Sequence, residues 1–201
     1  MIVCLMGPSA SGKSTLAKYL EAQQPQRFAR VPVDYFFVPR ADNQTPAEYF
    51  ASPLAYDWVA VDHALDTRIG EQRSTPDCDF ERFVRRSQFG GLPIREAPVY
   101  VLDGMRPHPR CDFVVMFDLD SHEQRRRLIE RDARWGTTVA DRDENLAATF
   151  DAGCAELPRT PDLRLSATDS IERNAVRVID ALSEHYLAGR TVTAMAPEKG
   201  A

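Results

Sequence analysis

The clearest indication of the fold lies at Met1–Leu20, MIVCLMGPSASGKSTLAKYL. Its apolar run Ile2–Met6 leads into Gly7–Ser14, which matches the pattern G-x-x-x-x-G-K-[ST]. The residues that follow, Thr15–Ala22, have the pattern of a helix. Strand, glycine-rich loop and helix in this order predict a loop that binds the phosphates of a nucleotide, because the glycines let successive backbone N–H groups point at phosphate oxygens.

Two side chains of this loop have expected chemical roles. Lys13 is expected to neutralise charge near the β and γ phosphates, and the hydroxyl of Ser14 is expected to bind Mg²⁺. The dipole of the following helix adds to the attraction for phosphate. The Asn-Lys-x-Asp motif of guanine-specific proteins is absent, so ATP is the expected nucleotide. The predicted nucleotide-binding residues of the loop are Gly7, Pro8, Ser9, Ala10, Ser11, Gly12, Lys13, Ser14 and Thr15.

The rest of the chain predicts an α/β fold. Short apolar runs that end near glycine or aspartate alternate with helical patterns, which is typical of a parallel sheet buried on both faces. We expect a P-loop NTPase-type three-layer α/β/α sandwich around a central, mainly parallel five-stranded sheet. The predicted strands are Ile2–Met6, Arg30–Val33, Val99–Asp103, Phe113–Leu119 and Leu163–Ala167.

Capping patterns predict where several helices begin. Thr45–Glu48 is a capping box with proline at the first helical position. Ser121–Gln124 and Asp169–Glu172 have the same kind of capping pattern and also predict helix starts. Helical patterns also cover Ala47–Phe50 and Trp58–Arg68.

The chain of 201 residues predicts a single domain, 1–188, followed by a flexible tail, 189–201. The region 41–98 is long for a connection between two strands, and we expect this largely helical insertion to carry the second substrate. It contains a polar segment at 73–93, RSTPDCDFERFVRRSQFGGLP.

Composition excludes several classes of protein. A hydrophobic share of 43% and a charged share of 27% are typical of a globular domain, and the net charge of −5 disfavours broad binding of nucleic acid or of a membrane surface. The four cysteines form no CxxC pair or metal-ligand cluster, so we expect no disulfide framework and a cytoplasmic location. His108 lies between two prolines and is expected in an exposed turn without a catalytic role. The sequence leaves the oligomeric state open between a monomer and a homo-oligomer.

The loop GPSASGKST and the residues near the ends of the strands resemble those of the uridine kinase/phosphoribulokinase family, over roughly Ile2 to Leu182. In that family an aspartate after the second strand accepts the proton of the substrate hydroxyl, and the resemblance gives Asp34, in VPVDYFF, this role. Asp103 ends the strand VYVLD and is expected to help hold Mg²⁺.

The segment EQRRRLIERDARWG resembles the arginine-bearing helix and lid of these kinases, and we expect a short lid at about 132–144. Arg127 and Arg131 are four residues apart and therefore share a helix face. The resemblance implies that both stabilise charge during phosphoryl transfer and that Arg131 also binds the nucleotide. Arg134 is a third candidate.

The resemblance also places substrate-binding residues in the insertion. Tyr35, Asp57, Phe80 and Arg85, together with Asp34, are expected at the acceptor. The sequence departs from the family at three positions where uridine kinases read the ribose and the base. These positions hold Ala51, Cys78 and Phe83.

The sequence thus predicts an ATP- and Mg²⁺-dependent kinase that phosphorylates a hydroxyl of a small molecule. A nucleoside, a sugar or a related alcohol are all open as acceptors. The altered acceptor residues leave two alternatives: a nucleotide-dependent switch or regulatory ATPase without an acceptor, and an antibiotic-modifying phosphotransferase.

Overall fold

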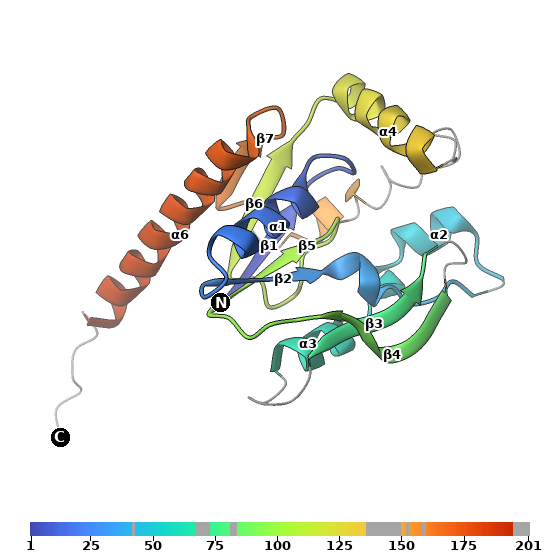
Figure 1. Cartoon of the computed structure of the whole chain (residues 1–201), viewed down its shortest axis with the longest axis horizontal. Helices are drawn as coiled ribbons and strands as arrows, with labels where there is room; N and C mark the ends of the chain where they lie inside the picture. The colour runs from blue at the N-terminus through green and yellow to red at the C-terminus, as the bar shows by residue number, and fades with distance from the viewer. Residues whose placement is uncertain are drawn as a thin grey trace.

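The computed structural model describes residues 1–41, 43–66, 73–80, 84–135, 150–151, 153–157 and 160–194. Its centre is a parallel sheet of five strands in the order β2-β5-β1-β6-β7 (Figure 1). These strands are β1 (Ile2–Met6), β2 (Phe28–Pro32), β5 (Val99–Asp103), β6 (Phe113–Asp118) and β7 (Leu163–Ser166). The predicted α/β fold and its five strands are confirmed.

The second strand begins and ends earlier than the sequence indicates. Phe28 and Ala29 are fully buried and pair with Val99 and Tyr100, so they belong to β2. Val33, expected at the end of the strand, instead opens the short 3-10 helix η1 (Val33–Phe36). This change places Asp34 in a turn directly beyond the sheet.

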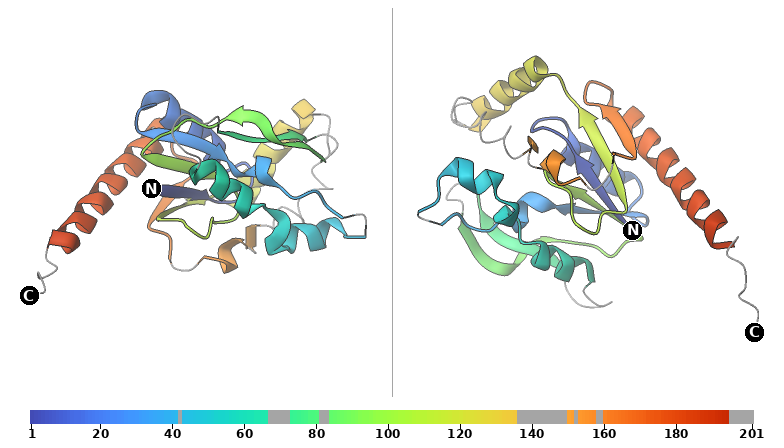
Figure 2. Two further views of the ribbon diagram at one scale, coloured as in Figure 1. Left: turned by 90° about the horizontal axis from the view of Figure 1, so that it is seen from below. Right: turned by 180° about the vertical axis from the view of Figure 1, so that it is seen from behind.

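Two hydrophobic clusters lie on opposite faces of the sheet because side chains of a strand alternate between its faces. Val3 and Leu5 pack in a cluster with α1 (Lys13–Gln23) and α6 (Ile171–Ala194). Ile2, Cys4 and Met6 face the other cluster, which includes residues of α3 (Trp58–Asp66). Figure 2 shows the sheet between these layers, with α4 (Ser121–Trp135) beyond the end of β6.

The insertion holds the helices that the sequence predicts and a hairpin that it does not. The short helices α2 (Pro46–Ala51) and η2 (Pro53–Ala55) precede α3. The segment described as polar instead forms an antiparallel pair of strands, β3 (Ser74–Asp79) and β4 (Val84–Pro93). The register of this pair shifts three times and most of β4 is exposed, so the sequence shows no two-residue alternation.

The helix caps agree with the sequence in one case and differ in two. Thr45 and Glu48 form the predicted capping box, in which Glu48 N donates to Thr45 Oγ1 at 3.3 Å and Thr45 N donates to Glu48 Oε2 at 2.8 Å. At α4 the cap is Asp120, whose Oδ1 accepts from His122 N at 2.8 Å, and not Ser121. At α6 the cap is Ser170, whose hydroxyl accepts from Arg173 N at 3.2 Å.

Helix α6 is longer than expected. It continues to Ala194, so the first part of the predicted tail is helical. Figure 1 shows its C-terminal turns projecting away from the sheet. Within the described residues, no helix combines the length and the apolar character needed to cross a membrane.

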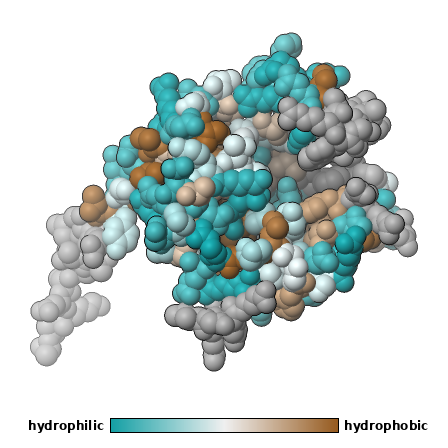
Figure 3. All heavy atoms as spheres, viewed as in Figure 1, coloured by the Kyte–Doolittle hydropathy of each residue, from teal (hydrophilic) through white to brown (hydrophobic). Residues whose placement is uncertain are grey.

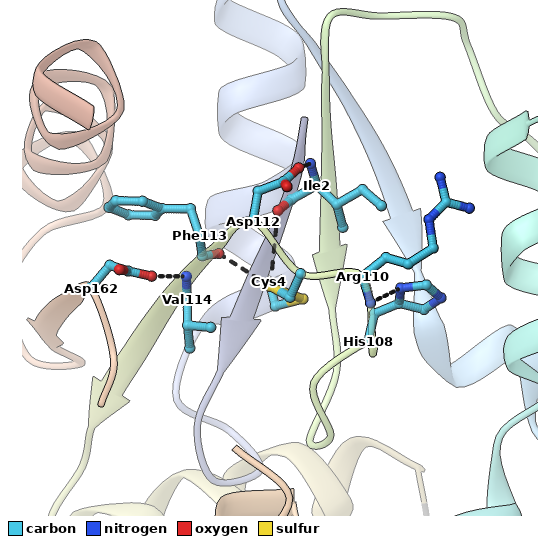
Figure 4. Close-up of a disulfide and its surroundings, with 9 residues drawn as sticks. Ile2, Cys4, His108, Arg110, Asp112, Phe113, Val114 and Asp162 are labelled. Carbon is cyan, nitrogen blue, oxygen red and sulfur yellow. Dashed lines mark hydrogen bonds between the residues drawn. A yellow bond between two sulfur atoms is a disulfide. The ribbon is translucent and has the colours of Figure 1, made fainter. Parts of the chain in front are cut away.

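Cys4 and Cys111 form a disulfide, which the sequence analysis did not expect (Figure 4). Cys4 lies in β1 and Cys111 lies just before β6, the strand that pairs with β1. Their Cα atoms are 6.1 Å apart although 107 positions separate them in the sequence. Cysteine spacing therefore gave the wrong expectation because the pair forms through strand pairing. Cys78 and Cys154 are free thiols.

The face of the molecule in Figure 3 is mostly hydrophilic, with hydrophobic residues in small scattered groups. On the hairpin, β4 exposes Val84, Phe89 and Leu92. The surface fits the globular class that the composition predicts.

The capping box makes a testable contribution to stability. Thr45→Ala removes both the acceptor for Glu48 N and the partner of the Glu48 carboxylate, so the free energy of unfolding should fall by about 1 kcal/mol. Urea unfolding measures the change. Thr45→Ser, which keeps the hydroxyl, is the control and should lie close to wild type. An equal loss in both variants would contradict a role for the hydroxyl.

Candidate active site

The loop between β1 and α1 has the backbone geometry of a phosphate-binding loop. Gly7, Ala10 and Gly12 all have positive φ, at 150°, 66° and 95°. A Cβ on Gly7 would lie 2.8 Å from Phe117 Cβ, so only glycine fits this close approach to β6. Gly12 occupies the N-cap of α1 in the left-handed region. The loop therefore turns back over the end of the sheet and opens onto the N-terminus of α1.

Lys13 is buried at the base of this loop. Its Nζ donates to Gly7 O at 2.9 Å and to Pro8 O at 2.8 Å. Desolvation lowers its pKa from 10.5 to about 8, while the negative charges of Asp34 and Asp103 oppose the change. The amine is therefore held inside the loop, and it loses its proton more easily than an exposed lysine.

Asp103 ends β5 beside the loop and is buried. Its Oδ2 forms an ion pair at 3.1 Å with a guanidinium nitrogen of Arg30, from the neighbouring strand β2. Burial raises the pKa of Asp103, and Arg30 and the Ser14 hydroxyl oppose the rise. Arg30 was not identified from the sequence, because a lone arginine in a strand gives no signal of its partner.

The same carboxylate fits a magnesium site. Asp103 Oδ1 is buried, and no described residue gives it a hydrogen bond. The Ser14 hydroxyl, at the start of α1, is close enough to influence the pKa of this carboxyl. An unpaired carboxylate oxygen beside a hydroxyl is the kind of oxygen donor set that Mg²⁺ prefers.

Asp34 faces the loop from η1. The hydroxyl of Tyr56, another residue that the sequence analysis missed, donates to Asp34 Oδ1 at 3.4 Å. Desolvation and then the negative charge of Asp103 raise the pKa of Asp34, whereas Lys13 and the Tyr56 hydrogen bond lower it. The two carboxylates thus share a region in which the charge of Asp103 makes ionisation of Asp34 harder.

A cavity of about 380 Å³ brings the loop and these carboxylates together. Its walls come from the loop, from α1, from η1, from the end of β5 and from α4. The lining residues are Ser9, Ala10, Gly12, Lys13, Ser14, Thr15, Asp34, Asp103, Gly104, Met105 and Arg131.

The two arginines of α4 occupy different places. Arg131 lines the cavity, and one of its guanidinium nitrogens donates to Ser9 Oγ at 3.2 Å. Arg127 is not among the lining residues; it donates to Ala10 O at 3.3 Å and to Ala167 O at 3.0 Å. Arg127 therefore ties α4 to the phosphate loop and to the loop after β7. The side chain of Arg134 and most of the predicted lid lie outside the described residues.

The residues assigned to the acceptor do not line this cavity, apart from Asp34. Asp57 and Arg85 form an ion pair at 2.8 Å, and Arg85 also donates to Phe37 O at 2.5 Å. Asp57 Oδ1 accepts from Ala60 N at 3.0 Å and so caps α3. This pair joins the hairpin to α3, which is a structural role that the sequence did not suggest.

Tyr35 and Phe80 form an aromatic pair near Asp34. Their ring centroids are 4.7 Å apart in an edge-on arrangement, and Phe80 is 46% exposed. Cys78 Sγ donates to Tyr35 O at 3.1 Å. Ala51 is exposed on α2, and Phe83 lies outside the described residues.

The expectation of an exposed His108 is wrong. The side chain is buried, lies edge-on to Trp58 at 5.1 Å, and its Nδ1 accepts from Arg110 N at 3.1 Å. Desolvation lowers its pKa. The turn between the two prolines folds back against α3 instead of extending into solvent.

Three solved structures share this fold. A protein from Silicibacter sp. TM1040, provisionally described as a fructose transport system kinase, matches with a TM-score of 0.58 and 24% identity over 82% of this chain and 89% of its own. A protein from Bacillus stearothermophilus, provisionally described as a uridine kinase, matches with a TM-score of 0.53 and 18% identity over 82% and 88%. A gluconokinase from Sinorhizobium meliloti 1021 matches with a TM-score of 0.50 and 13% identity over 96% and 97%.

All three are described as kinases, and this chain has their fold. No family model matches the chain.

The Arg30–Asp103 pair predicts a stability loss that depends on pH. Arg30→Met leaves the Asp103 carboxylate buried without its cation, so the free energy of unfolding should fall by about 2–3 kcal/mol near neutral pH. Without Arg30, the pKa of Asp103 in the folded protein rises further above its unfolded value. The loss should therefore be small at about pH 3, below the unfolded pKa, where Asp103 is largely protonated in both states, and grow toward about pH 8.

Urea unfolding of wild type and Arg30→Met across this pH range measures the effect. The double variant Arg30→Met/Asp103→Asn is the matched control, because an amide carries no charge to bury. It should be more stable than Arg30→Met near neutral pH and show little pH dependence relative to wild type. A loss of the same size at every pH would show that packing, and not charge, explains the effect.

Proposed function

We propose that this protein is an ATP-dependent kinase that transfers the γ-phosphate to a hydroxyl group of a small molecule. The observation that carries the proposal is the single cavity shared by the phosphate loop, Lys13, Asp34 and Arg131. The Asp34 carboxylate beside the phosphate loop can accept the proton of an acceptor hydroxyl. The fold of solved structures described as kinases supports the same class.

The loop residues supply the phosphate site. Backbone N–H groups of Gly7–Thr15 and the dipole of α1 bind the phosphates, and Lys13 neutralises their charge. Ser14 and Asp103 would hold Mg²⁺, which would supply further neutralisation of phosphate charge. Arg131 reaches the same cavity from α4 and stabilises negative charge that develops on the transferred group.

Asp34 performs the proton transfer. It accepts the proton of the acceptor hydroxyl as that oxygen attacks the γ-phosphorus. Its raised pKa makes it a stronger base than an exposed aspartate. Arg127, which holds the loop and the segment after β7 together, serves the reaction by keeping the loop in place.

The acceptor is a small hydroxylated molecule such as a nucleoside, a sugar or a related alcohol. Tyr35 and Phe80 offer aromatic surface beside Asp34. Asp57 and Arg85 stabilise the insertion that surrounds the acceptor, since each neutralises the other. The predicted cytoplasmic location, the absence of nucleic-acid and membrane partners and the choice between monomer and homo-oligomer stay predictions.

One observation favours a second candidate, a nucleotide-dependent switch or regulatory ATPase. Ala51 is exposed where uridine kinases hold the ribose, and Asp57 and Arg85 are occupied with each other. Such a protein would release ADP without any acceptor. An antibiotic-modifying phosphotransferase is a kinase whose acceptor is an antibiotic. A set of test acceptors that includes hydroxyl-bearing antibiotics therefore tests this alternative as well.

The test compares ADP release with and without acceptors. Wild-type protein with ATP and Mg²⁺ is incubated alone and then with nucleosides, sugars, other hydroxylated metabolites and hydroxyl-bearing antibiotics. Release that one compound stimulates, with a phosphorylated product by mass spectrometry, is the expected result. Equal release with every compound would favour the regulatory ATPase.

Asp34→Asn tests the base. The amide cannot accept the proton, so the transfer rate should fall at least about 100-fold, while the dissociation constant of ATP changes by less than about twofold. Calorimetric titration and the product assay measure the two quantities. Undiminished turnover by Asp34→Asn would rule out its role as the base.

The lowered pKa of Lys13 predicts proton uptake when ATP binds. At about pH 8.5 most of the free protein carries a neutral Lys13, and the phosphates favour its charged form. ATP binding should therefore take up protons near this pH and almost none near about pH 6, where Lys13 is already charged. Calorimetry in buffers with different ionisation enthalpies measures the uptake. Lys13→Met should abolish it, and equal uptake in this variant would assign the proton to another group.

A further inference from the structure

Tyr56 is fixed against the turn that carries Asp34. Tyr56 forms a β-bridge with Phe37, and its neighbours complete the pairing, with Asp57 N donating to Phe36 O at 2.8 Å and Val38 N donating to Ala55 O at 2.9 Å. The backbone of Tyr56 is thus bound to the residues that directly follow Asp34.

The Tyr56 ring is fixed as well. It is buried and stacks on Trp58, with a centroid distance of 5.4 Å and an interplanar angle of 27°. Trp58 in turn contacts the ring of His108, which is buried against α3. Packing fixes the Tyr56 ring, and strand pairing fixes its backbone. Together they keep the Tyr56 hydroxyl in one place.

The hydroxyl has a specific partner. It donates to Asp34 Oδ1 at 3.4 Å, and among the described residues it is the only group that donates a hydrogen bond to this carboxylate. Burial raises the pKa of Tyr56 well above its usual value, so the hydroxyl keeps its proton and remains a donor. A phenylalanine would fill the same space, so packing alone does not account for the hydroxyl.

We propose that Tyr56 is a positioning residue that orients the Asp34 carboxylate for proton transfer from the acceptor. The proposal rests on the function proposed above. With Oδ1 engaged by Tyr56, Oδ2 is left to accept the hydroxyl proton of the acceptor.

The reaction is balanced without a proton from Tyr56. The acceptor oxygen forms a bond to the γ-phosphorus and gives its proton to Asp34, while the bond from the γ-phosphorus to the bridging oxygen breaks and its electrons remain on ADP. Tyr56 keeps its own proton throughout. Its hydrogen bond also favours the charged form of Asp34 against desolvation and the nearby Asp103. The base is therefore ready to accept a proton before the acceptor binds.

Tyr56→Phe tests the proposal, and Tyr49→Phe is its matched control. Tyr49 is also buried, but its hydroxyl donates to Ala55 O at 3.2 Å and not to Asp34. Tyr56→Phe should lower kcat about tenfold and leave the KM for ATP within about twofold of wild type. Tyr49→Phe should keep kcat within about twofold. Thermal unfolding checks that both variants are folded.

A second measurement reports on the hydrogen bond without turnover. Carboxyl ¹³C NMR of aspartate-labelled protein at one pH detects Asp34, whose resonance is assigned by its loss in Asp34→Asn. The resonance should shift in Tyr56→Phe and stay in place in Tyr49→Phe.

The outcomes separate this proposal from the proposed function. If wild type phosphorylates no acceptor, the proposed function fails, and an Asp34 resonance that does not move in Tyr56→Phe would independently exclude the contact. If wild type is active, unchanged kcat in Tyr56→Phe overturns the positioning role whether or not the resonance moves. Equal losses of kcat in the two tyrosine variants would also overturn it, because they would indicate a general effect of buried hydroxyls.

Discussion

The parallel pairing of β1 with β5 on one side and with β6 on the other is the constraint on which the site depends. Parallel strands have their carboxyl ends at one edge of the sheet, where ligands of such folds bind. The loop after β1, Asp34 after β2 and Asp103 at the end of β5 meet there because of this pairing. The close approach of Gly7 to Phe117 on β6 fixes the loop against the same edge.

The arrangement concentrates charged side chains around one cavity. Desolvation and then the negative charge of Asp103 raise the pKa of Asp34, whereas Lys13 and Arg30 lower it. A buried charge is tolerated when it is paired and hydrogen-bonded, and Asp103, the buried acid of the two, has such a partner. Arg30 pairs with Asp103, which leaves one oxygen of that acid for a metal, and Tyr56 engages Asp34. The two carboxylates can therefore have different tasks a short distance apart.

The sequence predicts the parts of the site that follow local rules. The strands are apolar on both faces, the loop has a fixed spacing, and Asp34 and Asp103 come where strands end. Contacts between residues that are far apart in the sequence leave no local sequence pattern. Arg30 meets Asp103 over 73 positions and Tyr56 meets Asp34 over 22, while the Cys4–Cys111 disulfide joins β1 to the start of β6. The hairpin escaped prediction because an irregular register and exposure on both faces remove the alternation by which strands are recognised.

The acceptor is the least predictable part for a related physical reason. The ends of the sheet strands position the residues of the proposed transfer reaction, whereas the Asp57–Arg85 pair joins parts of the insertion to one another. Arg85 is neutralised by Asp57 and bonded to Phe37 O, so its charge stabilises the insertion and does little to attract an anionic acceptor. Solved structures of this fold bear the names of kinases for different acceptors, and similarity of the sheet carries no information about which acceptor this insertion fits.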